Sequence, residues 1–120
     1  MGLKVAESDK LGLKVAVAAK GLRGLGDEVS DVFGRARAFT IVTVEDSKIK
    51  GAKVVDNPAA SYEYGAGPIV TKMLAEMKVE IVIAGEFGMG ASVLLKDKNI
   101  RAVKVKAGTN VCRAVDSVIK

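Results

Sequence analysis

The stretch VEIVIAGEFGMGAS, residues 79–92, decides the fold of this chain. It opens with six residues, five of them apolar, and glycines follow at positions 85, 88 and 90. This pattern predicts a buried parallel strand, a tight loop and then a helix over about residues 91–98. Such a junction aims backbone N–H groups at the space above the sheet, which suits an anionic ligand.

The same patterns, followed along the chain, predict an α/β domain with the order β-β-β-α-β-α-β-α. The predicted strands are residues 13–19, 38–44, 49–55, 79–84 and 100–105, and the other helices begin at Pro68 and after Thr109 or Asn110. We expect the first three strands to pair antiparallel and the later units to add parallel strands by right-handed crossovers. One short helical turn is expected around residues 27–32. Residues 1–12 are expected to be an N-terminal extension or an extra strand, ahead of a single domain over residues 13–120.

The composition is that of one soluble domain, with 120 residues, 49% hydrophobic and 28% charged. The single cysteine, Cys112, allows no internal disulfide and fits a reducing cytoplasm. No signal-peptide core and no membrane-length apolar run is present, so we expect a cytoplasmic protein without a membrane partner. The net charge of +5 suits an anionic ligand, and nucleic acid is not the expected partner. We expect the basic run at residues 98–106 to protect a sheet edge.

Three glycine-rich loops are the candidate binding elements. In the first, GEFGMGAS, Gly85, Gly88 and Gly90 let the backbone approach a ligand, and the helix start supplies free N–H donors. The carboxyl end of a strand is also where open α/β sheets bind ligands. The alternative is a glycine-rich turn that only satisfies its own geometry. No Lys-Ser/Thr pair follows, so this is not a Walker loop.

The second loop is SDVFGRAR, residues 30–37, and the third is YGAGP, residues 64–68. In an extended segment Arg35 and Arg37 would point the same way, and their guanidinium groups match carboxylate or phosphate oxygens. The alternative is a pair of surface arginines beside a structural turn. In the third loop, Tyr62 and Tyr64 either cover a ligand or pack half-buried.

The residues that common catalytic sites need are missing. There is no histidine, which removes histidine-based triads and the commonest metal ligand. Cys112 lies on an apolar helical stripe, where we expect it to be buried and inert, and it is only a weak metal-ligand candidate. A nuclease would need clustered carboxylates, but the strands at 13–19 and 79–84 contain only Glu80. We therefore expect a binding protein rather than an enzyme.

The motifs VSDVFGRARAF, DNP, GAG and VEIVIAGEFGMGA, in this order, resemble the dinitrogenase iron–molybdenum cofactor biosynthesis family. Its members are NifX-like domains, which also form the C-terminal part of NifB-type proteins. The resemblance covers about residues 13–119. It implies a ribonuclease-H-like α/β fold with a five-stranded mixed sheet. It also implies non-catalytic binding or carrying of an iron–sulfur-type or iron–molybdenum cluster as cargo. We expect other cofactor-assembly proteins as partners and a monomer or weak homodimer as the oligomeric state.

Matching the motifs assigns cofactor-binding positions to this chain, and the charge argument adds Arg37. These positions are Ser30, Phe33, Gly34, Arg35, Arg37, Gly65, Gly67, Gly85, Gly88 and Gly90. Many relatives have histidine just before the Phe-Gly-Arg unit, where this chain has Val32, so side-chain ligation of iron would fall to Cys112 or carboxylates. The alternative ligand is a phosphorylated or nucleotide-like metabolite, which the same loops and charge would suit. Either ligand requires the three loops to meet over one rim of the sheet.

Overall fold

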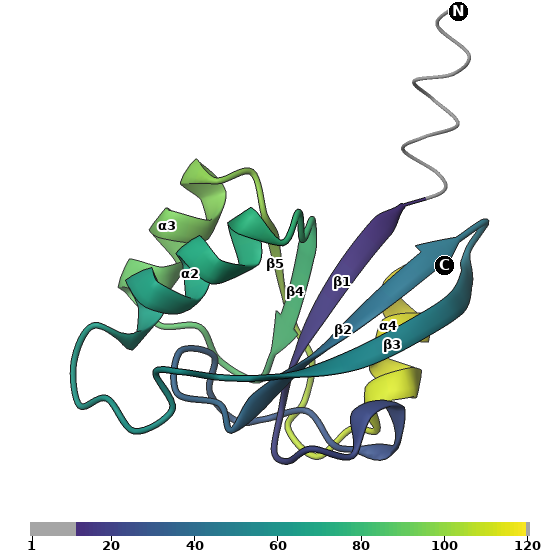
Figure 1. Cartoon of the computed structure of the whole chain (residues 1–120), viewed down its shortest axis with the longest axis horizontal. Coiled ribbons are helices and arrows are strands. Elements are labelled where there is room, and N and C mark those ends of the chain that lie inside the picture. The colour runs from purple at the N-terminus through teal and green to yellow at the C-terminus, as the bar shows by residue number, and fades with distance from the viewer. Residues whose placement is uncertain (1–11, 120) are drawn as a thin grey trace, which may run out of the picture.

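One mixed sheet with helices on both faces forms the body of the protein (Figure 1). The computed structural model describes residues 12–119. Within that range the elements are β1 (Leu13–Ala19), a 3-10 helix η1 (Gly24–Gly26), β2 (Ala38–Glu45), β3 (Lys48–Asp56), α2 (Ala66–Glu76), β4 (Ile81–Ala84), α3 (Met89–Asp97), β5 (Arg101–Lys104) and α4 (Val111–Ile119). The predicted extension or extra strand falls on residues 1–12, of which all but Gly12 lie outside the described residues, and Gly12 itself precedes β1.

The strands lie in the order β3-β2-β1-β4-β5. β1 pairs antiparallel with β2, and β2 with β3, whereas β4 pairs parallel with both β1 and β5. The expected five-stranded mixed sheet is thus confirmed. β5, which carries part of the basic run, is an edge strand, as its lysine and arginine side chains predicted.

Alternation along the strands divides the core into two layers. In β1, Ala16 and Ala18 pack under α2 and α3, and Val15 and Val17 pack under α4. Figure 1 shows α2 and α3 together on one face of the sheet and α4 on the other. All four residues of β4 are buried, which explains why its sequence is apolar without alternation.

The predicted helical turn at residues 27–32 is wrong. The backbone there is extended, because its amides bond to distant carbonyls: Val29 to Thr109 at 2.8 Å and Ser30 to Ala18 at 2.7 Å. These contacts join the segment to the end of β1 and to the loop before α4, which leaves its N–H groups unavailable to a local helix.

Two helix starts show how local chemistry sets the boundaries. Asn110 caps α4, because its side-chain oxygen accepts a hydrogen bond from the Arg113 amide at 3.1 Å. It is one of the two residues predicted for this cap. α2 begins at Ala66, so Pro68 is its third residue rather than its first. Gly65, with φ of 78°, makes the earlier start accessible, and proline is tolerated in a first turn because those amides have no helical partner.

Within residues 12–119, no helix combines the length and the apolar character that crossing a membrane requires.

Candidate functional site

A cavity of about 560 Å³ lies beyond the carboxyl end of β4, and all three glycine-rich loops contribute to its wall. Six of the predicted positions line it: Phe33, Gly34, Arg35, Gly67, Gly88 and Gly90. The other lining residues are Val32, Glu63, Ala66, Pro68, Glu86, Phe87, Ala91 and Leu94. Three segments separated by about 20 to 30 residues in the sequence therefore form a single hollow, as a shared ligand would require.

Close backbone packing holds the three loops together. A Cβ atom on Gly34 would lie 3.1 Å from the Gly67 nitrogen, so the second and third loops are in close contact. A Cβ atom on Gly85 would lie 2.9 Å from the Asp31 carbonyl oxygen, and the Gly85 amide donates to the Ser30 carbonyl at 2.9 Å. Space thus restricts position 85 to glycine and leaves little room for a side chain at position 34.

Two helices begin at this cavity with their first-turn amides free of side-chain caps. The N-cap residues are Gly65 for α2 and Gly88 for α3, and neither supplies a capping hydrogen bond. Neither first turn contains an acidic residue. The positive ends of two helix dipoles, with their unpaired N–H groups, therefore adjoin the same space, and both features favour a bound anion.

Arg35 stands on a turn that is fixed from several sides. The Ala36 amide donates to the Phe33 carbonyl at 3.3 Å, and the Phe33 ring packs against Phe39 and Phe87 with centroids 5.7 and 5.3 Å apart. Arg35 itself is exposed at the cavity wall. Its guanidinium group is free to meet a ligand while its backbone remains anchored.

Four predicted positions do not line the cavity. Ser30 and Gly85 hold the loops together behind it, and Gly65 caps α2 beside it. Arg37 instead forms an ion pair with Asp56 of β3 at 2.9 Å. The expectation that Arg35 and Arg37 point the same way is wrong, because residues 33–36 form a turn rather than an extended segment.

The comparisons with known proteins agree with these motifs. The family model described as dinitrogenase iron-molybdenum cofactor matches residues 13–120. The chain belongs to the dinitrogenase iron–molybdenum cofactor family. It is 28% identical over 108 residues to the uncharacterized protein MJ0580 of Methanocaldococcus jannaschii. The aligned region spans 90% of this chain and 87% of that protein.

Two solved structures resemble this family member closely. The apo form of the orange protein from Desulfovibrio gigas is 30% identical, with a TM-score of 0.78 over 87% of this chain and 84% of that one. A Thermotoga protein described as a candidate NifB protein is 33% identical, with a TM-score of 0.70 over 88% and 85% of the two chains.

Val32, at the position where the family resemblance leads us to expect histidine, also lines the cavity. It is 42% exposed, lines the cavity and forms a β-bridge with Glu86. A histidine at this position would therefore adjoin the cavity, whereas the valine here offers only apolar contact. Only the structure shows that this position belongs to the cavity wall.

Asn57, the middle residue of the DNP motif, supports the cavity wall although the sequence analysis did not name it as a site residue. Its side chain is buried, and its amide nitrogen donates to the carbonyls of Gly34 at 2.9 Å and Ala36 at 2.8 Å. Its oxygen accepts the Ala59 amide at 2.9 Å. Asparagine before proline is typical of a bend, but nothing local to it could reveal the distant partners that hold the Arg35 turn.

Two carboxylates, Glu63 and Glu86, also line the cavity and were not predicted as part of the site. The Glu86 side chain is 70% exposed and pairs with Lys104 at 3.3 Å, so its charge is largely offset. Glu63 is likewise exposed to solvent, which screens it. The two carboxylates that line the cavity therefore weaken the positive potential of Arg35 and the amide groups only slightly.

Cys112 lies away from this cavity, on α4 at the opposite face of the sheet from α2 and α3 (Figure 1). It is half-buried rather than buried as expected, because the buried face of α4 is formed by Val111, Ala114 and Val115. Among residues 12–119, no three histidine, cysteine, aspartate or glutamate side chains gather as a metal site would require. Tyr62 and Tyr64 do not line the cavity, and Tyr64 is 87% exposed.

Asp27 fixes the loop that leads into the first cavity segment. Its carboxylate accepts the amides of Arg23 at 2.9 Å and Glu28 at 2.8 Å, and pairs with the Arg23 guanidinium at 3.6 Å. Burial alone would raise the pKa of Asp27, but these hydrogen bonds and the charge of Arg23 outweigh it and hold the pKa below its ordinary value. The buried charge is therefore paired, as a stable loop needs.

Proposed function

We propose that this chain binds an anionic iron–sulfur-type cluster, resembling the iron–molybdenum cofactor, and carries it as cargo in metal-cofactor assembly without catalysing a reaction. One observation carries the proposal: two helix N-termini without side-chain caps and the Arg35 side chain adjoin a single cavity. Amide and guanidinium donors are the groups that hydrogen-bond an anionic cluster and its sulfur atoms. Family membership supports the assignment to cofactor assembly.

The proposed hold on the cluster is by hydrogen bonds and charge. No cysteine or histidine is among the residues that line the cavity, and Val32 stands where the family resemblance leads us to expect histidine. A cluster held by amides and Arg35 exchanges more readily than one bonded through cysteine sulfur, which suits a carrier that must pass its cargo to other cofactor-assembly proteins. We extend the proposal to a ribonuclease-H-like fold, which the family resemblance implies, and to a cytoplasmic setting, which the single cysteine fits.

Anaerobic titration tests the proposal. The purified protein is mixed with isolated iron–molybdenum cofactor, or with a synthetic thiolate-ligated iron–sulfur cluster, and uptake is measured by visible absorbance and by iron content after gel filtration. We expect Arg35→Gln to weaken uptake by about tenfold or more, since a charge-assisted hydrogen bond is lost.

Arg37→Gln is the matched control, because the same residue type two positions on pairs with Asp56 outside the cavity. It should leave uptake unchanged. If neither monomer nor any oligomer takes up either cluster, the proposal is rejected; if the two variants weaken uptake equally, the assigned site is wrong.

A phosphorylated or nucleotide-like metabolite is the second candidate ligand. The specific observation in its favour is that the cavity wall presents helix N-termini but no cysteine or histidine, and helix N-termini bind phosphate. A thermal-shift panel of nucleotides and phosphorylated metabolites tests it, because a bound ligand raises Tm by mass action. A rise in Tm that Arg35→Gln removes would favour the metabolite, and a flat panel would exclude the compounds tested.

A further inference from the structure

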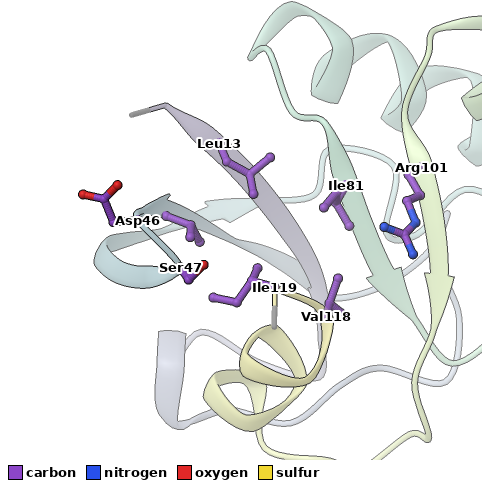
Figure 2. A pocket seen from close by; sticks show the side chains of 8 residues that line it. Leu13, Asp46, Ser47, Ile81, Arg101, Val118 and Ile119 are labelled. Carbon is purple, nitrogen blue, oxygen red and sulfur yellow. The ribbon is translucent and has the colours of Figure 1, made fainter. Parts of the chain in front are cut away.

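A second cavity, of about 620 Å³, lies at the opposite end of the strands from the candidate cluster site. It forms where β1, β4 and β5 begin, beneath the last turn of α4 and beside the β2–β3 turn (Figure 2). The two cavities share no lining residue. Whatever occupies this second space is therefore independent of the function proposed above.

Five of the eight residues that line this cavity have aliphatic side chains. The side chains come from three strands and one helix: Leu13, Val44, Ile81, Val118 and Ile119. Figure 2 shows the labelled members of this set gathered around one space. The volume lies in the range of small-molecule sites. A hydrocarbon group that moves from water into this cavity would gain apolar contacts, which favours binding.

One cation, Arg101, completes the wall. In Figure 2 its guanidinium group extends from β5 toward Val118 and the end of α4. Arg101 forms no salt bridge with any residue in the described part of the chain, although four other basic residues there do. Its planar donor pair is free to meet a carboxylate at the edge of the apolar surface.

The remaining charges limit the ligand to a single negative charge. Asp46 is also a wall residue, but Figure 2 shows its carboxylate directed away from the aliphatic group. The carbonyl end of α4 adds partial negative charge near Val118. One arginine against these groups favours a monocarboxylate over a phosphate dianion.

We propose that this cavity binds a medium-chain aliphatic carboxylate, with the hydrocarbon on the Leu13–Ile81–Val118 surface and the carboxylate on Arg101. The assignment combines the two features that define the space, an aliphatic wall and a guanidinium group without an ion-pair partner among residues 12–119.

Titration of the isotope-labelled full chain with octanoate, followed by amide NMR shifts, tests the proposal. We expect saturable shifts at Leu13, Ile81 and Val118 and none at Gly67 or Gly88. Across hexanoate, octanoate and decanoate, binding should tighten by up to about fourfold per added methylene. Octanol, octylamine and acetate should each bind more weakly than octanoate. Octanol lacks the negative charge, octylamine carries the opposite charge, and acetate lacks the hydrocarbon chain.

Arg101→Gln should weaken octanoate binding by about tenfold or more and leave octanol binding unchanged. Arg113→Gln is the matched control, since Arg113 is an exposed arginine on α4 outside this cavity, and it should have no effect. The proposal is overturned by the absence of saturable shifts, by octylamine or octanol binding as tightly as octanoate, or by an unaffected Arg101→Gln. Tighter binding by a short peptide with a C-terminal leucine would also overturn it, in favour of a protein partner.

Discussion

Replacing Asn57 by alanine is the most direct test of how the Arg35 turn is held. The substitution removes three hydrogen bonds of a buried side chain, to the carbonyls of Gly34 and Ala36 and from the amide of Ala59. Each such bond contributes about 0.5–1.5 kcal/mol net, and the abandoned groups are shielded from water. We therefore expect the free energy of unfolding to fall by about 2–4 kcal/mol.

Urea denaturation at neutral pH measures this loss. The midpoint should move to lower urea while the slope stays unchanged, because the surface exposed on unfolding is nearly the same. Hydrogen exchange should also show faster exchange of the Ala36 and Ala59 amides, while amides in β1 change only with global stability. A loss below about 0.5 kcal/mol, or unaltered exchange at Ala59, would refute the assignment of Asn57 as the residue that holds the turn.

The nearly isosteric Asn57→Asp provides a control with a pH signature. The new carboxyl group keeps an oxygen for the Ala59 amide, but when ionised it faces the carbonyl oxygens of Gly34 and Ala36 without a proton to donate. Burial and these carbonyls raise its folded pKa above the unfolded value of about 3.9. The stabilisation that the protonated carboxyl group provides is fully present below the unfolded pKa and is lost as pH rises through the folded pKa. The deficit relative to the unmodified protein should thus grow from pH 4 to pH 7, whereas equal deficits at both values would contradict this account.

Two further predictions concern the loops around the cavity. Gly85→Ala should destabilise the protein by about 1–3 kcal/mol in thermal denaturation, because the new methyl group would lie 2.9 Å from the Asp31 carbonyl oxygen and 3.0 Å from that of Ser30. Gly90→Ala should instead stabilise it by up to about 1 kcal/mol, since no atom outside its local backbone lies within 4 Å of the new group, and equal effects of the two would contradict the packing argument. Because the folded pKa of Asp27 lies below its ordinary value of 3.8, the stability it contributes is present above that value and lost as pH falls through the folded pKa. Asp27→Asn should therefore lose less stability between pH 7 and pH 3 in urea denaturation than the unmodified protein, and parallel losses would show that Asp27 is not the source.

The sheet was predictable because its determinants are local. β1 spans residues 13–19 as predicted, and the apolar run at residues 79–84 contains β4, since burial on both faces leaves no polar position. The segment at residues 27–32 was not predictable in the same way. Its backbone is extended because Val29 and Ser30 bond to residues far along the chain, and no local pattern encodes those partners.

The candidate site shows the same division between local and distant causes. The glycine-rich loops were recognisable, but Arg35 and Arg37 have the same side chain and nearly the same sequence context. A turn at residues 33–36 leaves one at the cavity wall, and Asp56 on β3 pairs with the other. Which of the two arginines reaches the cavity depends on where a neighbouring strand ends. The spacing of the two arginines in the sequence does not encode that position.

The two helices at the cavity begin with the same pattern, Gly-Ala-Gly in α2 and Gly-Met-Gly in α3. The cap glycines adopt positive φ, at 78° and 75°, so their backbone conformation accounts for them. The second glycines, Gly67 and Gly90, do not: neither has a positive φ, and an added Cβ would meet only an ordinary contact at 3.7 Å or nothing within 4 Å. Relative to alanine, each destabilises its helix by about 0.5–1 kcal/mol. Both line the cavity, where a side chain would cover the first-turn amides. The two glycines thus leave open space and exposed backbone at this wall, although they lower the stability of their helices. This is the pattern expected where a ligand approaches the main chain.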